Sequence, residues 1–139
     1  MVDLEVIQNR LQGLRALMPV LKSHRSLSKK DFETQIEKQL ATEHALQLAI
    51  QHVLDISSHL LSSRGVRDLT DYRDVILKMG KEGILPKDFV EKISGMAGFR
   101  NLLVHDYAEV DPVRVYDYLQ NRLDDFEEFM KLIAVHLDL

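Results

Sequence analysis

Four side chains between positions 100 and 107 could together act on a phosphodiester. Arg100, Asn101, His105 and Tyr107 supply a permanent cation, an amide, an imidazole and a phenol. A guanidinium matches two phosphate oxygens, and an imidazole, with an ordinary pKa of about 6.5, transfers protons near neutral pH. RNA brings its own nucleophile, the 2′-hydroxyl beside the phosphorus. These residue types are therefore suited to an RNA-cleaving site with no metal or other cofactor, in which Arg100 and His105 are catalytic.

In this site Asn101 would orient the imidazole or donate to phosphate, and Tyr107 could stack, donate or be modified. The bare spacing of an arginine and a histidine also arises by chance on solvated helix faces. The pattern alone therefore leaves an ordinary polar face open as the alternative.

The helical spacing of the four residues raises a geometric question. Successive residues of an α-helix turn by about 100°, so Arg100 and His105 lie roughly 140° apart around the axis. Either the long guanidinium reaches around the helix, or a second copy of the helix completes the site. We favour the second arrangement, because a two-fold homodimer would bring both copies into one cleft.

Composition limits the class of protein. A chain of 139 residues that is 45% hydrophobic is expected to form one domain, residues 1–139. It has no apolar run of about 20 residues and no evident signal peptide, and the absence of cysteine fits a reducing compartment. We therefore expect a cytoplasmic protein that has no membrane segment.

Charge is distributed unevenly around a net value of −4. The middle of the chain is the more basic part, with Arg64, Arg67, Arg73, Lys78, Lys81, Lys87, Lys92 and Arg100. The segment from residue 101 onward is mostly acidic. Contact with phosphate is therefore expected near the motif, and the acidic end should face solvent or a basic partner.

Apolar residues recur at helical spacing through the first half of the chain. The first stripe is Leu4, Ile7, Leu11, Leu14, Met18 and Leu21, with Pro19 expected to kink or end the helix. Ser28 and Asp31 resemble a capping box that opens a long second helix. Its apolar stripe is Phe32, Ile36, Leu40, Leu46, Ile50, Val53, Leu54, Leu60 and Leu61, and it ends near Gly65.

The second half predicts three more helices. One spans about 71–79, and the next opens at Pro86 as its first helical residue and carries the motif. Asp111 and Pro112 form a strong start signal for the last helix. With no convincing strand, the sequence predicts an all-α bundle of four or five helices.

Other polar residues have simpler interpretations. Gln51, Asp55 and His59 follow each other at intervals of four. A solvent face or hydrogen bonding between helices is favoured for them over metal binding or an RNA cleft. For Tyr72, packing or a dimer contact is favoured over catalysis.

Three segments resemble a known family. Residues 71–76, 83–86 and above all 95–107 (GMAGFRNLLVHDY) are similar to the HepT branch of HEPN-domain proteins. The pattern R-x4-H-x-Y of that family is matched by Arg100, His105 and Tyr107, and its polar residue after the arginine by Asn101. The resemblance implies a HEPN-type antiparallel bundle. It also implies a dimeric toxin that cleaves RNA without metal, and a minimal nucleotidyltransferase antitoxin that adds AMP to Tyr107.

Two functions of other classes remain as alternatives. The chain could be a non-catalytic subunit that binds a nucleotide or a partner within a nucleotidyltransferase complex. It could also be a helical dimer whose acidic last helix docks a partner.

Overall fold

The fold was analysed in a computed structural model, which describes residues 2–105 and 110–139, without the side chain of His105. The described residues form helices and no strand, which confirms the all-α prediction. The helices are α1 (Leu4–Arg25), α2 (Lys29–Thr34), α3 (Ile36–Ser63), α4 (Tyr72–Lys81), α5 (Lys87–Lys92), α6 (Met96–His105), α7 (Pro112–Asn121) and α8 (Leu123–Leu137).

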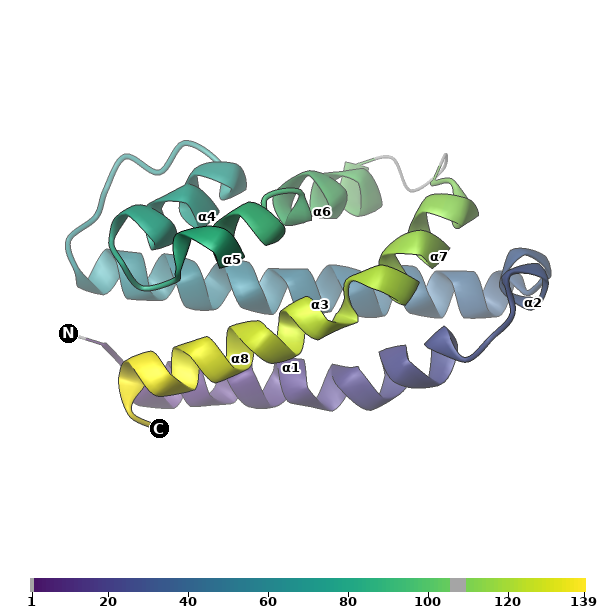
Figure 1. Cartoon of the computed structure of the whole chain (residues 1–139), viewed down its shortest axis with the longest axis horizontal. Coiled ribbons are helices and arrows are strands. Elements are labelled where there is room, and N and C mark those ends of the chain that lie inside the picture. Colours follow the sequence, from purple (N-terminus) through teal and green to yellow (C-terminus); the bar gives the residue numbers. More distant parts are fainter. Residues whose placement is uncertain (1, 106–109) are drawn as a thin grey trace.

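Helix α3 runs the length of the molecule and is the element on which the others pack (Figure 1). It lies antiparallel to α1 along one side, and it contacts α4 and α6 on the other. Helix α8 contacts both α1 and α3. The core is therefore enclosed by α1, α3, α8 and the segment that contains α4, α5 and α6. None of the helices in the described ranges is long and apolar enough to cross a membrane.

The predicted stripe of α1 is largely confirmed. Ile7, Leu14 and Leu21 are fully buried, whereas Leu4 is 46% exposed and does not belong to the buried face. Of the two outcomes expected at Pro19, a kink or an end of the helix, the end does not occur, because the helix passes through Pro19 and ends at Arg25. Proline removes one helical hydrogen bond, but the buried residues on both sides of Pro19 keep the helix against the core.

The predicted second helix is two helices. Ser28 caps α2 as expected, by accepting a hydrogen bond from the Asp31 amide at 3.1 Å. The chain then leaves the helical conformation at Gln35, where the side-chain amide of Gln39 donates to the carbonyl of Phe32 at 2.8 Å. This bond satisfies a carbonyl that the end of α2 leaves without a helical partner. Two residues placed in the apolar stripe are instead exposed, namely Ile36 and Leu40.

The fourth and fifth predicted helices are also interrupted. A turn at residues 93–95 separates α5 from α6, and a single non-helical residue, Arg122, separates α7 from α8. Helix α5 begins at Lys87, one residue later than predicted, and Pro86 is its N-cap and not its first helical residue. Asp111 caps α7 as predicted, and its carboxylate accepts from the Val113 amide at 2.9 Å.

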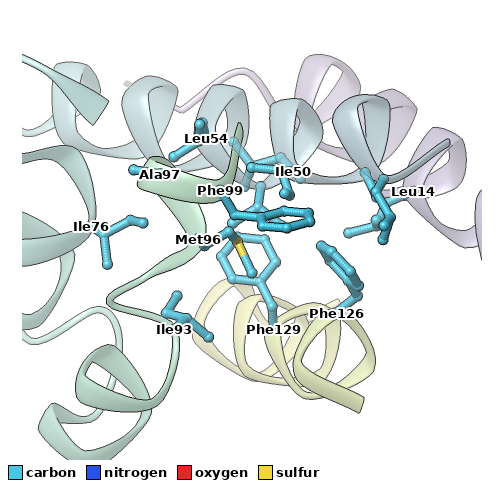
Figure 2. Packing of buried hydrophobic residues seen from close by; sticks show 14 of the residues in the cluster. Leu14, Ile50, Leu54, Ile76, Ile93, Met96, Ala97, Phe99, Phe126 and Phe129 are labelled. Atoms are coloured by element: carbon cyan, nitrogen blue, oxygen red, sulfur yellow. The ribbon is translucent and has the colours of Figure 1, made fainter. Parts of the chain in front are cut away.

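The core fixes the position of α6, which carries the motif. Met96, Ala97 and Phe99 project from one face of α6 toward side chains of α1, α3 and α8, among them Leu14, Ile50, Phe126 and Phe129 (Figure 2). Burying each large apolar side chain contributes about 1.5–3 kcal/mol. Because one face of α6 is anchored in this way, its neighbouring face is held in a fixed orientation beside α3 and α4.

Candidate functional site

The motif arginine lies at the boundary between the core and the surface. On α6, Phe99 is 7% exposed and stacks on the ring of Tyr118, with centroids 4.1 Å apart. Arg100 is half-buried and the adjacent Asn101 is exposed. Phe99 directly precedes Arg100 on α6. Its contact with Tyr118 therefore fixes the orientation of the part of α6 that carries Arg100 and Asn101.

Three contacts hold the guanidinium of Arg100. Its Nε donates to Oε1 of Gln51 on α3 at 3.2 Å, and its Nη1 donates to Oδ1 of Asn101 at 3.3 Å. The guanidinium carbon lies 4.9 Å from the ring centroid of Tyr72 on α4, within the range of a cation–π interaction. A cation fixed from three sides is preorganised for a ligand with defined geometry, such as phosphate.

A chain of polar contacts connects this site to α1. Nε2 of Gln51 donates to Oδ1 of Asp55 at 2.8 Å, which leaves Oε1 of Gln51 facing Arg100. Oδ2 of Asp55 pairs with Nη1 of Arg10 at 3.3 Å. The contacts thus run from α6 through α3 to α1, and they fix which way the amide of Gln51 points.

A half-buried histidine, His52, adjoins this chain of contacts. Burial lowers the pKa of His52, the guanidinium of Arg10 lowers the pKa further, and Asp55 opposes the shift. In the described part of the chain Nδ1 of His52 is buried without a hydrogen-bond partner. The lowered pKa favours the uncharged imidazole at the interface between α1 and α3.

A cavity of about 480 Å³ opens beside Arg100. It is lined by α3, the segment before α4, the first turn of α4, and Arg100 and Asn101 of α6. Its volume falls within the range typical of small-molecule sites, about 300–1,000 Å³. A larger hollow of about 590 Å³ lies between α1 and α8, and none of the residues that line it belongs to the motif.

The structure brings together some of the predicted site residues. Arg100 and Asn101 are in direct contact through the guanidinium and the amide oxygen. His105 is the last residue of α6, as the prediction of a helical motif requires. The side chain of His105 and all of Tyr107 lie outside the described residues, and their predicted roles therefore stay predictions.

Two residues of the site were not predicted. Gln51 contacts Arg100 from 49 positions away in the sequence, and Tyr72 lies under the guanidinium from α4. The sequence offered one weak signal for Gln51, its place in a polar face of α3 with Asp55 and His59 at intervals of four. The favoured interpretation of that polar face, hydrogen bonding between helices, is confirmed.

His59 also takes part in such bonding, because its Nε2 accepts from the Asp3 amide at 3.2 Å. Within the described ranges no group of three or more histidine, aspartate or glutamate side chains is placed to hold a metal ion.

Comparison with known proteins identifies the family. The family model described as "Ribonuclease HepT-like" matches residues 5–133. A protein named tRNA nuclease HepT, from Aphanizomenon flos-aquae (strain 2012/KM1/D3), is 30% identical over 133 residues, which cover 95% of this chain and 90% of the relative.

Solved structures share the fold. A toxin–antitoxin complex with AMP-PNP contains a chain with a TM-score of 0.85 and 21% identity, over 94% of this chain and 98% of that chain. A tri-AMPylated HEPN toxin from Shewanella oneidensis, in complex with an MNT antitoxin, has a TM-score of 0.84 and 22% identity, over 97% and 99%. The HEPN-type bundle predicted from the sequence is thereby confirmed, and the chain belongs to the HepT-like ribonuclease family.

Proposed function

We propose that this chain is the toxin of a toxin–antitoxin pair and acts as a metal-independent endoribonuclease. The observation that carries the proposal is the guanidinium of Arg100, held by Gln51, Asn101 and Tyr72 beside a ligand-sized cavity and on the same helix as His105. The membership of the chain in a ribonuclease family supports the proposal, and so does the relative named as a tRNA nuclease.

In the proposed reaction His105 takes the proton of the 2′-hydroxyl. The 2′-oxygen then forms a bond to the phosphorus while the bond to the 5′-oxygen breaks, and a proton is returned to the leaving oxygen. The products are a 2′,3′-cyclic phosphate and a 5′-hydroxyl. Arg100 stabilises the negative charge that develops on the phosphate oxygens, and Asn101 keeps the guanidinium in place.

RNA cleavage by purified variants tests this proposal. Arg100→Ala and His105→Ala are each expected to lower the cleavage rate at least about a hundredfold, since each removes a group that acts in the transition state. Wild-type activity should persist in EDTA and give cyclic phosphate ends by mass spectrometry. Circular dichroism should show unchanged helix content, because alanine favours the helix and Arg100 is only half-buried.

Cleavage that persists in both variants, free of contaminating nuclease, would reject the assignment. A wild-type protein that cleaves no RNA but binds nucleotide through Arg100 would instead favour the role of a non-catalytic subunit.

The antitoxin is proposed to be a minimal nucleotidyltransferase that adds AMP to Tyr107. The relative described as tri-AMPylated supports this modification. An added phosphate near Arg100 and His105 would compete with the phosphate of RNA by charge and by bulk. After co-expression with the antitoxin, intact mass should show added AMP on the wild type and none on Tyr107→Phe. The same mass gain on both proteins would place the modification elsewhere.

The proposal includes the setting in which the toxin acts. We expect one domain spanning residues 1–139, a homodimer, and action in the cytoplasm on RNA. The dimer matters most for mechanism, because Arg100 and His105 lie on one helix at positions roughly 140° apart around its axis.

A further inference from the structure

The cavity beside Arg100 has walls of two chemical kinds. Tyr72, Leu69 and Val75 provide an aromatic and apolar surface, while Ser58, Thr70 and Asp71 provide hydroxyls and a carboxylate. Arg100 and Asn101 complete the wall on the side of α6. A flat heteroaromatic ring with a polar edge has the chemistry that such a mixed lining would bind.

We infer that this cavity binds the nucleobase adjacent to the scissile phosphate and prefers a base with an amino group over uracil. The inference rests on the proposed RNA cleavage, because the phosphate of the same nucleotide would be held by Arg100. Single-stranded RNA is recognised by stacking of bases on aromatic rings or guanidinium planes, together with hydrogen bonds to the edges of the bases. Tyr72 and Arg100 contact each other through one face, and both line the cavity, so a base would stack on the outer face of one of them.

The preference follows from Asp71. Its Oδ1 accepts from the amide of Asp74 at 2.8 Å, as the N-cap of α4. Across the described ranges its second oxygen has no hydrogen bond or ion pair, and the residue is exposed at the wall of the cavity. An ionised carboxylate only accepts hydrogen bonds. It therefore suits the exocyclic amines of adenine, guanine and cytosine. Uracil offers one donor on that edge, its N3–H, which lies between two carbonyl oxygens that would repel a carboxylate.

Asp71→Asn separates recognition from folding. Asparagine caps a helix as well as aspartate does, so α4 should keep its first turn. With its oxygen accepting from the Asp74 amide, the asparagine side chain would present an NH2 donor to uracil where aspartate presents its second acceptor oxygen. A matched control is Asp3→Asn, because Asp3 caps α1 in the same way, through the amides of Glu5 and Val6, and does not line the cavity.

Isothermal titration calorimetry with the four ribonucleoside 3′-monophosphates tests the inference without requiring cleavage. The wild type and Asp3→Asn should bind 3′-AMP, 3′-GMP and 3′-CMP about tenfold more tightly than 3′-UMP. Asp71→Asn should remove that difference. Tyr72→Ala should weaken all four about tenfold through the loss of stacking.

Equal binding of the four nucleotides by the wild type would overturn the inference, and so would an unchanged preference in Asp71→Asn or the absence of nucleotide binding. The two proposals can fail separately. Base preference without RNA cleavage rejects the nuclease alone, and cleavage without base preference rejects the base pocket alone.

Discussion

At the scale of single residues, the arginine is the part of the site that the sequence predicted and the structure describes. Its type and its helix could be read from the motif. Asn101 was predicted to orient the imidazole or donate to phosphate, and the contact that the structure shows for its side chain is with the guanidinium of Arg100. The contact from Gln51 was not predictable, because it joins residues 49 positions apart. Which polar residue on α3 faces α6 depends on how the two helices pack, and a single sequence does not specify that.

The first prediction concerns the role of Gln51 in positioning. Gln51→Ala removes the acceptor of the Arg100 Nε–H, and a hydrogen bond to a charged group is worth about 1.5–3 kcal/mol. We expect kcat for RNA cleavage to fall about tenfold or more, with a smaller change in KM. Thermal unfolding should change little, because Gln51 is only partly buried.

A conservative replacement and a neighbouring residue serve as controls for Gln51. In the double variant Gln51→Glu/Asp55→Asn, a carboxylate oxygen of residue 51 still accepts from Arg100, and the amide of residue 55 donates to the other oxygen. RNA cleavage should therefore be largely restored relative to Gln51→Ala. Gln47→Ala, one turn earlier on α3, should leave kcat unchanged. Equal losses at positions 47 and 51, or no recovery in the double variant, would show that Gln51 does not position the arginine.

At the scale of elements, helix starts were predictable and helix interruptions were not. Ser28 and Asp111 cap helices through side-chain hydrogen bonds that short sequence patterns reveal. Gly65, with φ of +76°, ends the turn after α3, as a glycine there should. The breaks at Gln35 and Arg122 carry neither glycine nor proline, and the apolar spacing continues across them. Such breaks depend on tertiary contacts, such as the Gln39 amide that caps α2.

The packing of α1 on α3 gives the second prediction. A Cβ at Gly13 would lie 2.8 Å from Nε2 of His52, which is too close without movement of the ring. Alanine is favoured over glycine inside a helix by about 1 kcal/mol, whereas overpacking costs about 1–3 kcal/mol. Gly13→Ala should therefore destabilise the wild type but stabilise the His52→Ala variant.

Urea unfolding of the four proteins measures this coupling. The expected difference between the two backgrounds is about 1–3 kcal/mol in the free energy of unfolding. If Gly13→Ala changes the free energy of unfolding by the same amount in the wild-type and the His52→Ala backgrounds, the His52 ring is not the reason for a glycine at position 13.

At the scale of the whole molecule, the fold class and the family could be inferred from the sequence because both depend on patterns spread over the chain. Apolar spacing predicted the bundle, and the solved HEPN toxin has the same fold. The assembly depends on a surface that no local pattern specifies. The case for a homodimer rests on the 140° separation of Arg100 and His105 along one helix, and on the two-fold symmetry by which each protomer could complete the site of the other.

The central claim, that each site combines Arg100 of one protomer with His105 of the other, is tested most directly by mixing two inactive variants. Arg100→Ala and His105→Ala are unfolded together and refolded, so that mixed dimers form, and RNA cleavage is measured. Each mixed dimer would contain one intact composite site, and the mixture should regain roughly a quarter of wild-type activity. If the mixed dimers form and the mixture stays as inactive as either variant alone, the shared site is contradicted.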